Sequence, residues 1–312
     1  MANKNNCINV MFCGNDKVID GMIIATLSIV KYCKKPLNIH IMTMDLSNIE
    51  KRFTPITDKH CGLLEKIVKK ENKSSKVILH DLTEIFNKEM ASNNLNIDTH
   101  YTPYIFLRLL SDKVEDIPDK ILYLDSDLVF YGDISEIFDI DITEYEVAMA
   151  KDFYGKVFIN PGYMNSGVVL MNMENIKKKD SFKKAREMCL SKKMLLPDQS
   201  ALNKCCEKRL LLPRKFNEQN KRHKDTIIRH YSMKIIFLPW PHLLNIKPWE
   251  VERIHDIYKI HDYDDIIEEY LKIKKENKSI MPKSQKYAGK QNTHMFKILK
   301  EKIIGKKGKK NI

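Results

Sequence analysis

The segment at residues 120–130 restricts the fold most, because a short apolar run in it ends on two closely spaced carboxylates. Residues 121–124 read Ile-Leu-Tyr-Leu, a pattern typical of a strand in a parallel sheet that is covered on both faces. Asp125 and Asp127 follow this run, separated by Ser126. In open α/β sheets, ligands bind at the carboxyl ends of the strands. We therefore expect the two carboxylates to lie in a ligand-binding crevice.

The aspartate pair has two interpretations. Carboxylates held side by side repel each other unless a cation lies between them or one of them is protonated. The pair therefore predicts a divalent metal ion and, with it, a phosphate ligand. The alternative is a turn followed by a helix N-cap, where Asp and Ser are also favoured.

Strand-like and helix-like segments alternate along most of the chain. This alternation predicts an α/β fold with a Rossmann-like, doubly wound and mostly parallel sheet that has helices on both faces. Thr102 and Pro103 form a helix start, and α-helical spacing after it would place Tyr104 and Arg108 on one face. The expected strands are at residues 8–13, 37–44, 77–81, 121–124, 146–150 and 167–171, and further helices are expected at 18–32, 174–190 and 198–206.

The net charge of +13 belongs mainly to the end of the chain. Residues 272–312 contain 14 lysines and two glutamates, a charge of +12, so residues 1–271 carry about +1. We therefore expect a folded domain at 1–271 and a lysine-rich tail at 272–312, and we do not expect nucleic-acid binding. The tail is either solvated or attached to an anionic membrane surface.

Composition and the N-terminal residues favour a cytoplasmic protein. No apolar run approaches the roughly 18 residues that a spanning helix needs, and the first residues lack a signal-peptide pattern. The seven cysteines have no paired metal spacing, which favours reduced thiols. If the tail binds lipid, we expect a peripheral location on the cytoplasmic face of the inner membrane.

Polar residues gather at the ends of several expected strands. Because such ends converge on one crevice in a doubly wound sheet, we expect their side chains to lie close together. A histidine and two aspartates form a suitable ligand set for Mn²⁺ or Mg²⁺. Structural alternatives are a turn role for Asn15, an ion pair with a nearby carboxylate for Arg108, a surface charge for Asp152 and a core position for His230. The candidates beyond the aspartate pair are Asn15, Arg108, Asp152, Asn165, Gly167, Asp198, Gln199, His230 and Lys247.

Seven short motifs extend this pattern over nearly the whole domain. They are FCGND at 12–16, YIFLR at 104–108, YLDSDL at 123–128, NSGVV at 165–169, LPDQS at 196–200, RHY at 229–231 and KPW at 247–249. In this order the motifs resemble those of glycosyltransferase family 8, the retaining GT-A enzymes that include bacterial lipopolysaccharide glucosyl- and galactosyltransferases. The resemblance implies a GT-A catalytic domain at residues 1–271.

The resemblance also implies substrates and residue roles. The donor would be UDP-glucose or UDP-galactose, the acceptor a saccharide or lipid-linked saccharide, and the ion Mn²⁺, with Mg²⁺ as the alternative. Three residues would be catalytic. Arg108 and Asp152 would hold the donor sugar, and Gln199 would lie near the anomeric carbon. The remaining assignments are Asp125, Asp127 and His230 as metal ligands and Asn15, Asn165, Gly167, Asp198 and Lys247 as donor contacts.

The reaction course and two other functions are also considered. A carboxylate is the usual nucleophile in double displacement. The residue expected near the anomeric carbon is Gln199, a poor nucleophile, so we favour same-face attack in which its amide oxygen stabilises the developing positive charge. One alternative is a haloacid dehalogenase-type phosphohydrolase, which carries Asp-x-Asp on its first strand. The other is a non-catalytic sugar-nucleotide-binding protein.

Overall fold

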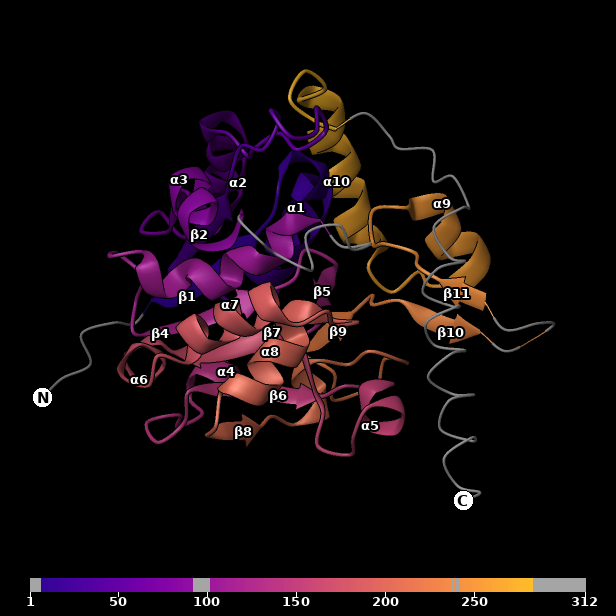
Figure 1. The fold of residues 1–312 in the computed structure, drawn as a ribbon. Helices are drawn as coiled ribbons and strands as arrows, with labels where there is room; N and C mark the ends of the chain where they lie inside the picture. Colours follow the sequence, from indigo (N-terminus) through magenta and orange to yellow (C-terminus); the bar gives the residue numbers. More distant parts are fainter. Residues whose placement is uncertain (1–6, 92–101, 237, 239–241, 283–312) are drawn as a thin grey trace, which may run out of the picture.

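A seven-stranded sheet forms the centre of the described part of the protein (Figure 1). The computed structural model describes residues 7–91, 102–236, 238 and 242–282. In spatial order the strands are β3 (Lys76–Asp81), β2 (Leu37–Thr43), β1 (Ile8–Cys13), β4 (Lys120–Leu124), β7 (Met164–Asn172), β6 (Val147–Lys151) and β8 (Arg209–Leu211).

The direction of β7 distinguishes it from its neighbours. It pairs antiparallel with both β4 and β6, whereas the other pairings of this sheet are parallel. The predicted mostly parallel sheet is therefore confirmed. Because β7 runs in the opposite direction, its first residues lie at the edge where β1, β4 and β6 end.

Helices cover both faces of the sheet, as predicted (Figure 1). On one face, apolar side chains of β1, β2 and β4 pack against α1 (Ile19–Tyr32) and α2 (Asp58–Glu71), and α10 (Asp264–Glu276) packs on α1. On the other face, side chains of β4, β6 and β7 pack against three further helices, which are η3 (Pro103–Lys113), α7 (Ser181–Ser191) and α8 (Pro197–Cys205).

Shorter elements connect these layers. Two small antiparallel sheets pair β5 with β9 and β10 with β11. Their strands are β5 (Leu128–Phe130), β9 (Ile228–His230), β10 (Lys234–Ile236) and β11 (His242–Leu244). The short helices are η1 (Asp16–Val18), α3 (Thr83–Phe86), η2 (Asn87–Ala91), α4 (Ser135–Phe138), α5 (Gly155–Phe158), α6 (Met173–Lys178), η4 (Arg214–Phe216), α9 (Val251–Arg253) and η5 (Ile254–Tyr258).

Two helices differ from the prediction. The segment after Thr102 is a 3₁₀ helix, and with three residues per turn Tyr104 and Arg108 do not share a face in the way that α-helical spacing predicts. The helix expected at 174–190 is divided into α6 and α7, because Asp180 adopts a left-handed conformation with φ of 54°. One such residue interrupts the helical hydrogen bonds.

The predicted domain boundary at residue 271 falls within α10. Lys274 of this helix donates a 2.8 Å hydrogen bond to Asp20 of α1, so the first lysines of the predicted tail belong to a packed helix. Residues 283–312, which include the rest of the tail, lie outside the described residues. Within the described part, none of the helices combines the length and the apolar character needed to cross a membrane.

A pair of histidines lies on β2 and β3. His40 is 3% exposed, and its Nδ1 lies 3.1 Å from Nε2 of His80, with the rings stacked. Burial, followed by the charge of His80, lowers the pKa of His40 from 6.5 to about 4. The folded protein therefore holds this imidazole neutral at pH values where the unfolded chain is protonated.

This difference predicts a pH-dependent stability. The free energy of unfolding should fall by up to about 3 kcal/mol as the pH drops from 6.5 to about 4, because the unfolded chain takes up the proton first. Urea unfolding of the wild type and of His40→Gln across this range measures the effect. The variant should have the shallower pH dependence, and equal slopes would contradict the prediction.

Candidate functional site

A cavity of about 790 Å³ opens where β1 and β4 end. Its walls include segments far apart in the sequence, from the turn after β1 to α10. Five predicted site residues line it, and they are Asn15, Arg108, Asp125, Asp127 and Lys247. The other six are buried residues that hydrogen-bond or pack beside these side chains, and they are Asp152, Asn165, Gly167, Asp198, Gln199 and His230.

The aspartate pair and His230 form one cluster. His230 Nε2 lies 3.2 Å from Asp127 Oδ1 and 3.6 Å from Asp125 Oδ2. One ligand atom from each residue lies within 4.8 Å of the others. Two carboxylates and an imidazole are a donor set that fits a divalent ion such as Mn²⁺.

Strand pairing brings His230 to the aspartates. In the antiparallel pair of β5 and β9, Leu128 lies opposite His230. The backbone N–H of Tyr231 also donates a 2.9 Å hydrogen bond to the carbonyl of Asp127. The imidazole therefore reaches the end of β4 although about a hundred residues separate the two segments.

Positive groups balance the charge of Asp127. Lys247 Nζ lies 2.5 Å from Asp127 Oδ2. Burial alone would raise the pKa of the Asp127 carboxyl, but the charges of Lys247 and His230 outweigh burial and hold this pKa well below its ordinary value. For His230, burial alone would lower the pKa, but the interaction with Asp127 and then Asp125 raises it overall.

Arg108 and Tyr123 fix the other aspartate. Arg108 Nη2 donates to Asp125 Oδ1 at 3.2 Å, and the hydroxyl of Tyr123 donates to the same oxygen at 2.6 Å. The guanidinium lies 3.9 Å from the centre of the Tyr123 ring. These two donors occupy Oδ1, so Oδ2 of Asp125 remains directed toward His230.

Arg108 also joins two other parts of the site. Its Nη1 donates a 2.5 Å hydrogen bond to the carbonyl of Ser166, and its Nη2 lies 3.2 Å from Asp198 Oδ2. Burial raises the pKa of the Asp198 carboxyl, with Arg108 opposing this shift and Asp125 adding to it. The structural alternative expected for Arg108 is therefore observed, because its guanidinium forms ion pairs with both Asp125 and Asp198.

A chain of hydrogen bonds orients the imidazole of His230. His230 Nδ1 lies 3.2 Å from Asn217 Oδ1, and Asn217 Nδ2 donates to Asn165 Oδ1 at 2.9 Å. Asn165 Nδ2 donates in turn to Asp152 Oδ2 at 2.8 Å. Because an amide oxygen accepts, this arrangement places a proton on Nδ1 and directs Nε2 toward the two aspartates, where the neutral ring could bind an ion. Sequence reasoning missed Asn217, which lies in a loop without a recognisable motif.

Asp152 and Gln199 support the site from within. Asp152 Oδ1 accepts backbone N–H bonds from Tyr154 and Gly155 at the start of α5, and its Oδ2 also accepts from Gln199 Nε2 at 3.1 Å. Gln199 Oε1 accepts from the backbone N–H and the hydroxyl of Ser166. Asp152 is thus a buried carboxylate, and its interpretation as a surface charge is wrong.

Asn15 has the turn role that was one of its predicted interpretations. Its side chain accepts from the Lys17 N–H at 3.3 Å as the N-cap of η1 and donates to the Arg52 carbonyl at 3.4 Å. It also lines the cavity. The turn interpretation and the position in a ligand-binding crevice are therefore compatible.

Two glycines permit close packing around the aspartates. A Cβ atom at Gly21 in α1 would overlap the carbonyl of Ser126 and the ring of Trp249. A Cβ atom at Gly167 would overlap the His230 ring and would lie 2.9 Å from Asp125 Oδ2. Gly167 was predicted as a donor contact, and in the structure its missing side chain makes room for the metal-ligand candidates. Gly21 was missed because a glycine within an apolar helix carries no evident functional signal.

Solved glycosyltransferases have the same fold over most of the chain. The galactosyltransferase LgtC, solved with donor and acceptor sugar analogues, matches with a TM-score of 0.59 over 89% of this chain and 98% of that chain at 17% identity. GlyE of Streptococcus pneumoniae matches with a TM-score of 0.58 over 89% of this chain and 66% of that chain at 19% identity. The fold is therefore the predicted GT-A fold.

The chain belongs to glycosyl transferase family 8, whose sequence model matches residues 9–252. The predicted family is thus confirmed. A probable glycosyl transferase of Streptococcus gordonii is 36% identical over 40% of this chain and 18% of its own length. The lipopolysaccharide 1,3-galactosyltransferase of Salmonella typhimurium is 28% identical over 48% of this chain and 49% of its own length. The match thus spans half or less of these two relatives.

The packing at Gly21 predicts a specific loss of stability. Gly21→Ala should lower the free energy of unfolding by about 1–3 kcal/mol, because the added methyl group displaces Ser126 or Trp249. Gly62→Ala is the matched control, since Gly62 lies in α2 and a Cβ atom added there would meet no other atom within 4 Å. This control should gain about 0.4–1 kcal/mol. Urea unfolding compares the variants, and equal stabilities would contradict the prediction.

Proposed function

We propose that the protein is a metal-dependent, retaining glycosyltransferase that moves glucose or galactose from a UDP-sugar to a saccharide acceptor in cell-surface glycan or lipopolysaccharide synthesis. Family membership supports glycosyl transfer. The names of two relatives, a lipopolysaccharide 1,3-galactosyltransferase and a lipopolysaccharide 1,2-glucosyltransferase, support the choice of hexose and acceptor. The observation that carries the proposal is the meeting of two carboxylates and an imidazole beside a large cavity.

Asp125, Asp127 and His230 would hold the divalent ion, which we propose to be Mn²⁺, with Mg²⁺ as the alternative. Their donor chemistry and mutual spacing fit such an ion. When bound, the ion would act as a Lewis acid on the donor diphosphate. Arg108 and Tyr123 keep Asp125 Oδ2 directed toward this centre.

Lys247 is proposed to bind the diphosphate. Its ammonium group lines the cavity and lies beside Asp127. Negative charge builds on the leaving phosphate as the sugar departs, and a fixed cation next to it stabilises that charge most effectively where water is excluded. Asn15 lines the same cavity and is proposed to contact another part of the donor.

Hydrogen bonding at Asp152 and Gln199 supports same-face attack. Each oxygen of Asp152 already accepts two N–H groups, which makes this carboxylate a weak nucleophile for double displacement. Two donors from Ser166 also occupy the Gln199 amide oxygen. Gln199 would need to exchange one of them to face the anomeric carbon, so we propose that it mainly positions the donor sugar together with Asn165, Gly167 and Asp198.

The alternatives differ in their support. A phosphohydrolase of the haloacid dehalogenase type would carry the aspartate pair on the first strand, whereas Asp125 follows β4, and family membership favours transfer. A non-catalytic sugar-nucleotide-binding protein would share the fold and differ in activity. An assay of catalysis therefore separates it from the proposed enzyme.

Asp127→Asn should reduce Mn²⁺-dependent transfer at least about a hundredfold, because it removes one ionic ligand of the centre and a partner of Lys247. The assay follows labelled glucose and galactose from their UDP-sugars onto a panel of saccharide acceptors, together with UDP release. Glu207→Gln, which changes an exposed carboxylate, is the matched control. Wild-type rates in Asp127→Asn would refute the metal assignment. Donor binding without transfer or hydrolysis in the wild type would support the non-catalytic alternative.

We also propose that the lysine-rich tail attaches the protein to anionic lipid at the cytoplasmic face of the membrane. Residues 283–312 contain ten lysines and one glutamate, and each lysine near such a surface contributes about 1 kcal/mol. A lipid-linked acceptor would make this location useful.

A chain ending at Pro282 tests the attachment, because it keeps α10 intact. The full chain should sediment with phosphatidylglycerol vesicles at low salt and should be released by high salt, since screening weakens exposed charge interactions. The shortened chain should remain in the supernatant. Equal sedimentation of both chains would show that another surface binds the lipid.

A further inference from the structure

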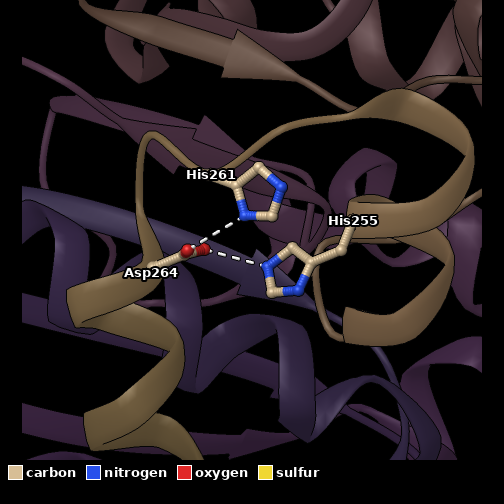
Figure 2. Close-up of side chains that lie close together, drawn as sticks. All are labelled: His255, His261 and Asp264. Atoms are coloured by element: carbon tan, nitrogen blue, oxygen red, sulfur yellow. Dashed lines mark hydrogen bonds and ion pairs between the residues drawn. The ribbon is translucent and has the colours of Figure 1, made fainter.

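A second group of metal-ligand side chains lies outside the cavity, on η5, at the start of α10 and in the segment between them. Figure 2 shows the imidazoles of His255 and His261 approaching the carboxylate of Asp264. His255 Nε2 lies 2.9 Å from Asp264 Oδ1, and His261 Nδ1 lies 3.1 Å from Asp264 Oδ2. The two rings are stacked, with centroids 4.4 Å apart.

Buried neighbours hold this cluster in place. Ile254, which precedes His255, is fully buried, and Tyr263, which precedes Asp264, is 2% exposed. The Tyr263 hydroxyl donates a 3.1 Å hydrogen bond to the carbonyl of Pro248. The backbone on both sides of the cluster is therefore anchored in the core, while the three polar side chains stay accessible to solvent.

The neighbouring acids have other partners. Asp262 pairs with Arg222 at 3.2 Å, and Asp265 pairs with Lys31 at 2.5 Å. The Asp264 carboxylate, in contrast, lies between the two imidazoles. A neutral imidazole presents a lone pair that can bind a metal ion as well as accept a proton.

The donor types and spacing suit a transition-metal ion. Two imidazole nitrogens and a carboxylate oxygen favour Zn²⁺ and related ions, whereas Mg²⁺ and Ca²⁺ prefer oxygen ligands. Tetrahedral Zn²⁺ with bonds of about 2.0–2.1 Å places neighbouring ligand atoms about 3.4 Å apart. The two imidazole nitrogens lie 2.9 and 3.1 Å from different oxygens of Asp264. One ligand atom from each of the three residues lies within 4.8 Å of the others, so small side-chain adjustments bring the three atoms to this spacing.

We propose that His255, His261 and Asp264 form a surface site for Zn²⁺ or a similar transition-metal ion, with water completing the coordination. The site is separate from the Asp125 centre and does not depend on the proposed sugar transfer. An ion bound here joins η5 to the start of α10. Residues just before η5 and residues on α10 both line the cavity, so the ion stabilises the C-terminal wall of the cavity.

Zn²⁺ titration of the full chain by calorimetry tests this site. All the proteins compared carry Asp127→Asn as a common background, which weakens ion binding at the Asp125 centre. The Zn²⁺ binding that remains therefore measures the proposed cluster. In this background, His261→Ala and His255→Ala should each raise the dissociation constant for Zn²⁺ at least about tenfold. Zn²⁺ should also raise the melting temperature of the background protein more than that of either variant, because binding to the folded state stabilises it.

His223→Ala is the matched control, since His223 is an exposed histidine beside Glu218 and should leave Zn²⁺ binding unchanged. His261 is 60% exposed, so its replacement should preserve the fold, which circular dichroism checks. Equal Zn²⁺ affinity in the background protein and both cluster variants would overturn the proposal. An equal loss in His223→Ala, or no Zn²⁺ binding in the background protein, would also overturn it.

Discussion

Charge compensation at the end of β4 is the interaction on which the site depends. Asp125 and Asp127 are close enough to repel each other, and burial of unpaired charge is costly. Arg108 contacts the first carboxylate, Lys247 contacts the second, and His230 lies between them. These groups come from three separate parts of the chain, so the site forms only when the whole domain has folded.

The antiparallel direction of β7 explains why so many polar residues meet at one edge. A parallel strand in this position would carry Asn165 and Gly167 to the opposite edge of the sheet. Because β7 runs against β4 and β6, its first residues reach the ends of those strands. Gly167 then lies beside Asp125 and His230, where a side chain would not fit.

The cavity wall formed by the last helices has its own support. Trp249 packs against Gly21 of α1, and Lys274 of α10 is paired with Asp20 of the same helix. The C-terminal segments therefore pack against α1 and form one wall of the cavity. The histidine cluster at the start of α10 lies within this arrangement, and an ion bound there would strengthen it.

The sequence by itself determined the α/β class, most strand positions and the family. Apolar periodicity and the order of motifs are properties of the chain that do not depend on which distant residues meet in the fold. It also predicted that the side chains of Asp125, Asp127 and His230 lie together, as the structure shows, since all three stand in short recognisable motifs. The tertiary structure alone decided the role of Asn217 and the need for glycine at position 21. Their importance comes from contacts with residues distant in sequence, and no local pattern encodes which distant groups will pack together.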